Sequence, residues 1–549
     1  MPFTVQPHGI MLPTDSSDSN AEETADLEEI LDRLSEADEK VRFEAVEMLS
    51  DYRSESETER KISLLVETLG DESPRVRFKA AQTLGETASE SVFTRDIDQD
   101  ALGEAVDTLV ETADDDSVGV RGGSVTALGE FTQFDPSFEE RITRAAVGRL
   151  DDEYPQVRAD SVDTLRSVAR TLSYDEGDHL PLLERISEAV AERLTDEDRD
   201  VRSGAESVFE TIYEVGPEAR SVVVSTLLTL ATDRDAETRR AAASGLGSVV
   251  TTATVRTEDL TAFEENLDEL IGLVLDADSQ VRQNGVSLFR SLAREKAVLE
   301  ADVIEEIAAY VEAESPATRS RAVSALASLS KGSSENGERA FESVTAAVED
   351  PDPEVREQAL VALEEIGNND TELGKRAVSA ASDALDDPDP DVRKRAVRSL
   401  GELGEVGRLD DLDPSVTKVA TDRLVEHSDE DAAVRREVVA ALGSLGDQRS
   451  VREESTREEF RKRAVRSLGE RASASDGEVR SEAVFHIYTI LRSDAAAASA
   501  VPIGPILSVE AESDDSDTSR EATLVLREVA REEPSKFENV DANSEEYLG

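Results

Sequence analysis

The sequence predicts an all-α fold: an α-solenoid superhelix of about thirteen tandem two-helix repeats. A turn and helix with the sequence EDPDPEVREQALVALEEIG begins at Glu349, and DDPDPDVRKRAVRSLGELG begins 37 residues later. One apolar position recurs along nearly the whole chain, mostly at steps of 37 or 42 to 45 residues, which is the period of two-helix solenoid repeats. Around that position, apolar residues keep the spacing of an amphipathic helix.

The recurring position marks the start of the second helix of each repeat, and we call it the column position. A small or short residue stands four positions after it and a large one eight positions after it, as Ala359 and Leu363 follow Val355. These positions share one helical face, so we expect that face to point inward and to let neighbouring helices approach closely. The column residues are Val41, Val76, Val120, Val157, Val201, Thr238, Val281, Thr318, Val355, Val392, Val434, Val479 and, weakly, Thr518.

The first helix of each repeat and the turn before the second helix are also visible. Residues 373–387, LGKRAVSAASDALDD, place Ala377, Ala381 and Leu385 on one side of a helix. Proline stands two residues before several column positions, as at Pro353, where the opening turn of a helix needs no N–H. The aspartates of these turns are suited to capping the second helix.

An arginine follows nearly every column residue, in the first helical turn, where the helix dipole disfavours a cation. A residue placed repeatedly against this field needs an anionic partner, and an aspartate stands five positions before most column residues. We therefore predict a ladder of Asp–Arg hydrogen bonds, each contributing about 1 to 3 kcal/mol; Asp350 has Arg356 and Arg393 as candidate partners. The predicted ladder residues are Asp71, Arg77, Asp115, Arg121, Asp152, Arg158, Asp196, Arg202, Asp233, Arg239, Asp276, Arg282, Asp350, Arg356, Asp387, Arg393, Asp429 and Arg435.

The turn and helix DPDPEVREQALVALEEIG resemble HEAT repeats, in particular the HEAT-like class first associated with phycobilin lyases. The resemblance covers roughly residues 25–532 and implies an α-solenoid with the first helices on its convex side and the second helices on its concave side. The sequence departs from the pattern at Ala313 and Ala474, which stand where a ladder aspartate is expected, and at Thr518, which is followed by Ser519 instead of arginine. We expect the ladder to be interrupted at these positions.

Outside the repeats of residues 25–532, the sequence predicts a disordered N-terminal tail, residues 1–24, and a C-terminal tail, residues 533–549. The apolar start of the first tail, FTVQPHGIMLP, also suits a short docking segment. The N-terminal residues lack the basic start and apolar run of a signal peptide, and no apolar run approaches the roughly 18 residues needed to cross a bilayer. We expect a cytoplasmic protein without membrane contact.

The chain is strongly acidic, since 123 Asp and Glu against 60 Lys and Arg give a formal net charge of −63. Such a surface repels itself in dilute salt, whereas in molar salt the Debye length falls to about 3 Å. The composition therefore favours adaptation to concentrated intracellular salt over a surface made for a basic partner. It also disfavours nucleic acid as a partner, because phosphate contacts need positive surface.

Few residues offer catalytic or metal-binding chemistry. The chain has no cysteine, which excludes thiolate ligands and nucleophiles. HEAT-repeat hydroxylases, which the repeat class also resembles, carry His-Glu dipeptides on successive repeats, and none occurs here. The stretch from Asp196 begins like an EF-hand loop, but Val201 replaces its glycine and Ser207 its final glutamate. The histidines stand singly, at His8, His179, His427 and His486. We predict no enzymatic activity, cofactor or metal.

One window departs from the acidic background: residues 392–471 contain 17 basic and 17 acidic residues. Several of its cations are expected to project away from the packed faces of their helices. We call them the basic strip: Lys394, Arg395, Arg398, Arg436, Lys462, Arg463 and Arg466. Two interpretations stay open, namely a solvated face with salt bridges within and between repeats, and a docking site for an acidic protein segment or a phosphate-bearing ligand.

These observations favour a non-enzymatic scaffold or adaptor that binds other proteins on the concave surface, since solenoids expose long surfaces suited to that work. The sequence does not identify the partner. The alternative is an enzyme-associated relative of the phycobilin lyase or HEAT-repeat hydroxylase class, which a bound chromophore or metal would support. A weaker third interpretation is nucleic-acid handling by the basic strip, which salt-dependent electrophoretic shifts would reveal.

The net charge generates a prediction about salt. Dialysis from molar salt to about 10 mM lengthens the Debye length from about 3 Å to about 30 Å, so that carboxylates repel one another across the array. We expect the helices to loosen or unfold, which far-ultraviolet circular dichroism measures directly. An unchanged helical signal at low salt would contradict the salt-adapted interpretation of the charge.

Overall fold

The computed structural model describes residues 27–52, 57–91, 97–173, 179–256, 259–295, 297–332, 334–405 and 432–446, with short helical pieces at 461–462, 464–469, 483–487 and 489–490. In these residues the regular secondary structure is α-helix with short 3-10 turns, and no strand occurs among them. The prediction of an all-α solenoid is confirmed. The predicted tails, residues 1–24 and 533–549, lie outside the described residues.

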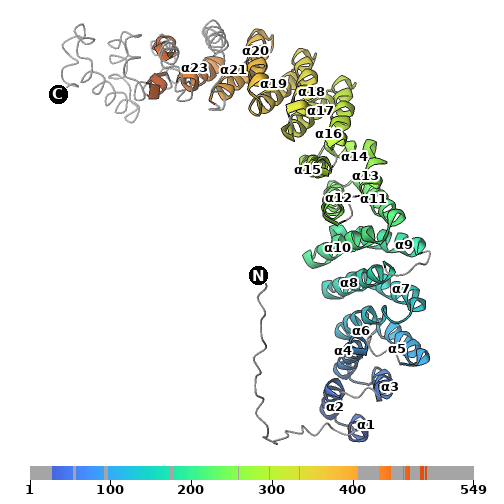
Figure 1. The fold of residues 1–549 in the computed structure, drawn as a ribbon. Helices are drawn as coiled ribbons and strands as arrows, with labels where there is room; N and C mark the ends of the chain where they lie inside the picture. The colour runs from blue at the N-terminus through green and yellow to red at the C-terminus, as the bar shows by residue number, and fades with distance from the viewer. Residues whose placement is uncertain are drawn as a thin grey trace, which may run out of the picture. The chain divides into compact units, whose positions relative to one another are not determined.

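Contacts divide the chain into two compact units, Met1–Thr226 and Leu227–Gly549, with the division inside α11 (Pro217–Ala231). In the first unit each first helix is followed by a second helix that packs against it (Figure 1). The pairs are α1 (Leu27–Leu34) with α2 (Glu39–Asp51), α3 (Thr58–Thr68) with α4 (Pro74–Ser91), α5 (Gln99–Thr112) with α6 (Val118–Phe131), α7 (Glu139–Arg149) with α8 (Pro155–Leu172), and α9 (Leu180–Ala191) with α10 (Arg199–Val215).

The second unit continues the same alternation. Its helices are α12 (Ala236–Arg256), α13 (Thr261–Glu264), α14 (Leu267–Val274) with α15 (Ser279–Glu295), α16 (Ala297–Ala309) with α17 (Pro316–Leu329), α18 (Ser334–Ala346) with α19 (Pro353–Gly367), α20 (Thr371–Asp383) with α21 (Pro390–Glu405), and α23 (Ala432–Gly446). First helices of the described residues end in a 3-10 turn just before the ladder position at η3 (Glu192–Thr195) in the first unit and at η4 (Tyr310–Glu312), η6 (Ala347–Glu349) and η7 (Ala384–Asp386) in the second.

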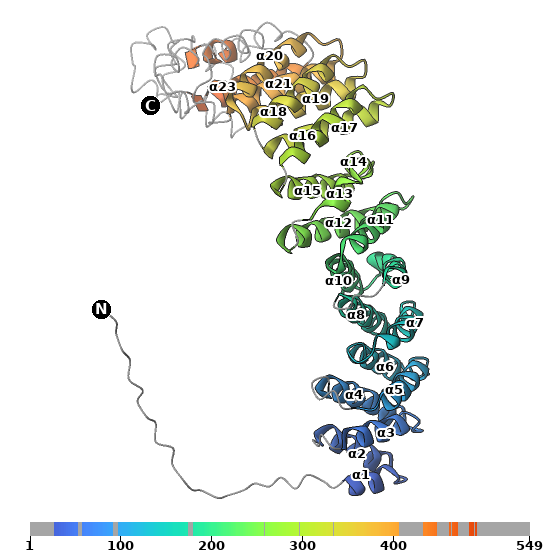
Figure 2. The ribbon, with the colours of Figure 1, turned by 45° about the vertical axis from the view of Figure 1, so that its right-hand side comes forward.

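Within each unit the second helices form one layer and the first helices form another (Figure 1, Figure 2). In the first unit α2, α4, α6, α8 and α10 each contact the next in that order, and α3, α5, α7 and α9 do the same in the other layer. In the second unit the second helices are α12, α15, α17, α19, α21 and α23. Each pair therefore buries its apolar faces against the pairs on either side, which is the source of stability in a solenoid.

The column position falls in the first turn of a second helix in every described repeat. Eleven of the thirteen predicted column residues lie in these helices, and the other two, Val479 and Thr518, lie outside the described residues. The column valines from Val76 to Val434 are at most 1% exposed, and large residues eight positions later, such as Phe209, are fully buried. The predicted inward face is therefore confirmed for these repeats.

Aspartate and proline begin the second helices as the sequence indicates. Asp352 is the N-cap of α19, its carboxylate accepting a hydrogen bond from the N–H of Glu354 at 2.9 Å, and Pro353 fills the first helical position. Asp198 caps α10 by accepting from the N–H groups of Asp200 and Val201. Capping leaves fewer N–H groups unsatisfied where the chain enters each second helix.

Small residues bring neighbouring second helices into close contact. At Gly85 in α4, a Cβ atom would lie 3.0 Å from Cα of Ala127 in α6 and 3.2 Å from its Cβ. Main-chain atoms cannot move away as the end of a flexible side chain can, so this crossing requires glycine. Gly103 in α5 is the opposite case, because a Cβ atom there would meet no atom within 4 Å.

Two matched substitutions test this packing. We expect Gly85→Ala to lower the free energy of unfolding by about 1 to 3 kcal/mol through overpacking. Gly103→Ala should instead raise it by about 0.4 to 1 kcal/mol, since alanine favours the helix and nothing obstructs its methyl group. Urea unfolding of the full chain measures both values, and an equal effect of the two substitutions would show that the α4–α6 crossing does not depend on glycine.

Candidate functional site

The ladder consists of bidentate pairs between an arginine of one second helix and an aspartate of the next repeat. In each pair Nε and Nη2 of the guanidinium donate to the two carboxylate oxygens at 2.7 to 3.0 Å. This is the geometry of strong, charge-assisted pairs. The pairs are Arg42–Asp71, Arg77–Asp115, Arg121–Asp152, Arg158–Asp196, Arg239–Asp276, Arg319–Asp350 and Arg356–Asp387.

The pairing runs from each arginine to the aspartate that follows it in the chain. The carboxylate of Asp350 accepts two hydrogen bonds from Arg319, both at 2.7 Å, and not from Arg356 or Arg393, its two candidate partners from the sequence. Arg356 donates to the carboxylate of Asp387 and reaches Asp350 through the main chain, where Nη1 donates to the carbonyl oxygen at 2.8 Å. The sequence-based choice of partners for the carboxylate of Asp350 was therefore wrong, by one repeat for Arg356 and by two for Arg393.

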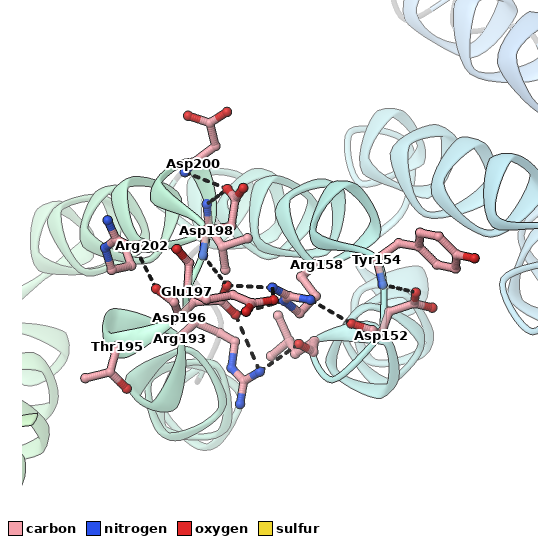
Figure 3. A network of polar contacts seen from close by, with 12 residues as sticks. Asp152, Tyr154, Arg158, Arg193, Thr195, Asp196, Glu197, Asp198, Asp200 and Arg202 are labelled. Atoms are coloured by element: carbon pink, nitrogen blue, oxygen red, sulfur yellow. Dashed lines mark hydrogen bonds and ion pairs between the residues drawn. The ribbon is translucent and has the colours of Figure 1, made fainter.

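The third nitrogen of each guanidinium, Nη1, binds main-chain carbonyls of the turn that precedes its own helix. Nη1 of Arg158 donates to the carbonyl oxygens of Asp152 at 2.9 Å and Glu153 at 3.5 Å, while Nε and Nη2 donate to Asp196 (Figure 3). With Glu197, whose carboxylate accepts from Nη2 at 3.4 Å, five acceptor atoms surround this cation. They offset the unfavourable helix dipole and explain why arginine stands in the first turn of the second helix.

The aspartate organises the turn that it occupies. The carboxylate of Asp196, which is 5% exposed, also accepts a hydrogen bond from the N–H of Asp198 at 2.9 Å, and Arg193 approaches it at 3.9 Å (Figure 3). Burial raises the pKa of Asp196, but the hydrogen bonds from Arg158 and Asp198 outweigh burial and lower that pKa below its usual value. The pKa is lowered in the same way at Asp71, Asp115, Asp152, Asp350 and Asp387. These carboxylates are therefore charged at neutral pH.

The ladder is interrupted at Ala313, as the sequence predicts. Arg282 keeps the main-chain half of the arrangement, since its Nη1 donates to the carbonyl oxygens of Asp276 at 2.8 Å and Ala277 at 2.9 Å. In the part of the chain that the structure describes, no carboxylate forms an ion pair with Arg282.

The structure describes the contacts of only some of the remaining predicted ladder residues. Nη1 of Arg202 donates to the carbonyl oxygens of Asp196 and Glu197, and Nη1 of Arg393 donates to those of Asp387 and Pro388. Asp233 accepts from the N–H of Asp235 at 2.7 Å. Asp429, Ala474 and the side chain of Arg435 lie outside the described residues.

Lys394, Arg395 and Arg398 of the basic strip form ion pairs with carboxylates of described residues. Lys394 pairs with Asp391 at 2.8 Å, Arg398 pairs with Glu437 at 2.7 Å, and Arg395 pairs with Glu364. The side chain of Arg395 is only 18% exposed, so the expectation that it projects away from the packed face was wrong.

The Arg395–Glu364 pair shows how strongly this part of the strip is engaged inside the protein. Burial raises the pKa of Glu364, and the opposing charge of Arg395 offsets part of that rise. Of the other strip residues, Lys462 is half-buried and Arg466 is exposed, while the side chains of Arg436 and Arg463 lie outside the described residues. Docking of a partner on the strip stays a prediction.

Apart from the ladder and the basic strip, the described residues offer little support for a catalytic site. No group of three histidine, aspartate or glutamate side chains is close enough there to hold a metal ion. The described helices also include none with the length and apolar character that crossing a membrane requires. A surface cavity of about 580 Å³ lies between α5 and α7, with Asp100, Glu104, Phe138 and Arg141 in its lining.

Comparison with known proteins identifies the repeats. The family described as HEAT repeats matches residues 27–98, 304–373 and 341–427, which contain α1 to α4 and α17 to α21. The chain therefore contains HEAT repeats in these segments. No curated protein sequence matches the chain significantly, and the predicted association with phycobilin lyases stays untested.

Solved structures show the same architecture. A Kap121p mutant has a TM-score of 0.51 at 14% identity, with 95% of this chain and 56% of that chain covered. Kap121p gives 0.49 at 16% identity with the same coverage, and yeast importin-β (Kap95p) gives 0.43 at 15% identity, with 93% of this chain and 68% of that chain covered. The chain thus spans just over half the length of Kap121p. At 14% identity the likeness to the Kap121p mutant shows the fold, an α-solenoid, and nothing of function.

Sequence reasoning missed two groups of surface residues. Arg290 and Lys331 line a cavity beside Arg282, and the spacing of Arg282 and Arg290, eight residues apart on one helix, is the signal that could have identified them. Phe78 is 40% exposed on α4; its place two residues after a column valine was available as a clue.

A double-mutant cycle tests the direction of the ladder. We expect Asp350→Ala and Arg319→Ala to couple by about 1 to 3 kcal/mol in the free energy of unfolding, because they remove the two halves of one bidentate pair. The matched cycle of Asp350→Ala with Arg356→Ala should couple by less than about 0.5 kcal/mol, since Arg356 binds the main chain of residue 350. Urea unfolding measures both cycles, and the reverse order of the two coupling energies would contradict the observed pairing.

Proposed function

We propose that the chain is a non-enzymatic scaffold or adaptor that binds partner proteins on the surface formed by its second helices, in a cytoplasm of concentrated salt. The observation that carries this proposal is the ladder. Each bidentate pair holds a second helix against the next repeat, so α2 to α10 in the first unit and α17 to α21 in the second present continuous surfaces. Surfaces of this kind in solenoids suit extended polypeptide partners.

The exposed ring of Phe78 is further evidence that the surface formed by the second helices is the binding face. Phe78 is 40% exposed in a chain with only 4% aromatic residues. The neighbouring helix α6 leaves room beside the ring, because Gly119 and Gly123 carry no side chains; a Cβ atom on Gly123 would lie 3.0 Å from Cδ2 of Phe78. A partner that buries this ring gains a large apolar contact, as aromatic hot spots do in protein interfaces.

Site-specific photo-crosslinking in the organism that encodes the chain tests the proposal. A photoreactive phenylalanine replaces Phe78 in one variant and Tyr310 in the control. Tyr310 is also an exposed aromatic residue, at 36%, but it lies in η4 at the end of a first helix. We expect a cross-linked polypeptide at position 78 and none at position 310.

Affinity for the captured partner then supplies the quantitative test. Phe78→Ala should weaken binding by about 2 kcal/mol, or about 30-fold, whereas Tyr310→Ala should leave it nearly unchanged. Equal cross-linking or equal loss at the two positions would overturn the second-helix surface as the binding face. A bound chromophore or metal without any polypeptide partner would favour the enzyme-associated alternative.

A further inference from the structure

The break in the ladder leaves Arg282 without a carboxylate partner among the described residues. Nη1 of Arg282 binds the carbonyl oxygens of Asp276 and Ala277, just as Nη1 of Arg319 binds those of Ala313 and Glu314. In Arg319 this arrangement directs Nε and Nη2 toward the aspartate of the next repeat. At the corresponding place after Arg282 the chain has a methyl group, that of Ala313.

A cavity opens beside this arginine, between α15 and α17. Its volume is about 430 Å³, and its lining includes the cations Arg282, Arg290 and Lys331, the hydroxyls of Ser287 and Ser324, and the apolar side chain of Val286. No aspartate or glutamate belongs to the described lining. This is unusual in a chain where acidic residues outnumber basic ones by 123 to 60. The cavity is therefore a local positive surface on an acidic protein.

The cations that line the cavity retain N–H donors for a ligand. Arg290 donates from Nη2 to the carbonyl oxygen of Ser328 at 2.5 Å, and Lys331 pairs with Glu365 at 3.2 Å. The Lys331–Glu365 pair is exposed on both sides, at 42% and 40%, and exposed ion pairs of this kind hold their partners weakly. Since a guanidinium has five N–H donors and an ammonium has three, the observed contacts leave capacity on each cation.

The spacing of the cations selects the kind of ligand. Arg282 and Arg290 are eight residues apart in α15, which places them about 12 Å apart along the helix axis. Nη1 of Arg282 is held by the carbonyls of Asp276 and Ala277, and Nη2 of Arg290 by that of Ser328, so we expect one carboxylate to contact only one of the two arginines. An extended polypeptide advances about 3.3 Å per residue, so acidic side chains about four residues apart match this separation.

We propose that this cavity binds an acidic segment of a partner protein, with one carboxylate of the segment on Arg282 in place of the aspartate missing at Ala313. The inference rests on the proposed scaffold function and assigns a partner chemistry to one site on the second-helix surface. In concentrated salt the net negative charge of the chain does not repel such a segment, because screening confines electrostatics to about 3 Å and contact pairs decide the affinity.

The test uses a fluorescein-labelled poly-glutamate peptide and the full chain at about 1 M potassium chloride, where the Debye length is about 3 Å. Fluorescence anisotropy reports binding. The decisive variant is Ala313→Asp, which restores the ladder and occupies Arg282 from within. The matched control is Gln280→Glu, which adds the same charge two residues from Arg282 at an exposed position outside the cavity lining.

We expect saturable binding to the wild type, affinity weakened by about tenfold or more in Ala313→Asp, and affinity within about twofold of the wild type in Gln280→Glu. Arg282→Gln should weaken binding by a similar factor and decides the matter if Ala313→Asp does not fold. Absence of saturable binding to the wild type, or equal effects of Ala313→Asp and Gln280→Glu, would overturn the site.

The two proposals fail separately. If poly-glutamate does not bind while the position-78 photo-crosslink captures a partner, the acidic-segment site is overturned and the scaffold function stands. If poly-glutamate binds at Arg282 while position 78 captures nothing, the binding face proposed around Phe78 is overturned and the acidic-segment site is supported.

Discussion

The structure depends on one kind of interaction. The arginine that follows the column residue donates hydrogen bonds to two successive repeats. Its Nη1 holds the carbonyls of its own turn, and its Nε and Nη2 hold the carboxylate of the next repeat, as Arg158 shows with Asp152 and Asp196. A helix pair in a solenoid has no globular core of its own, so its orientation relative to the next pair must come from such contacts. The bidentate geometry fixes this orientation more narrowly than apolar packing alone.

Apolar packing and the ladder act on the same helices from different ends. At the start of each second helix the guanidinium joins two turns. Further along, small residues such as Gly85 let main chains approach within contact of Ala127. Because both devices repeat with the period of the sequence, the second helices of each unit form a layer whose outer surface is free to vary. Exposed residues such as Phe78 therefore differ from repeat to repeat without disturbing the stack.

Two clusters of cations stand out because the chain as a whole is acidic. Where cations gather on α21, carboxylates from neighbouring helices meet them, as Glu364 meets Arg395 and Glu437 meets Arg398. The cavity beside Arg282 differs, since the ladder carboxylate is missing and the lining retains three cations. Local composition does not separate these two cases. They differ in whether packing brings a carboxylate of another repeat to the arginines; among the described cations of the cavity, Lys331 alone has such a partner, Glu365.

The sequence by itself determined the helices, the period, the column and the break at Ala313, because these depend on residues close together in the chain and on spacing within one helix. Only the tertiary structure decided which aspartate each arginine binds, that Arg395 is half-buried against Glu364, and that a cavity lies between α15 and α17. The physical reason is that these contacts join residues that are far apart in the chain. Ladder partners 29 to 38 residues apart, such as Arg42 with Asp71 and Arg77 with Asp115, meet only after the helix pairs have packed.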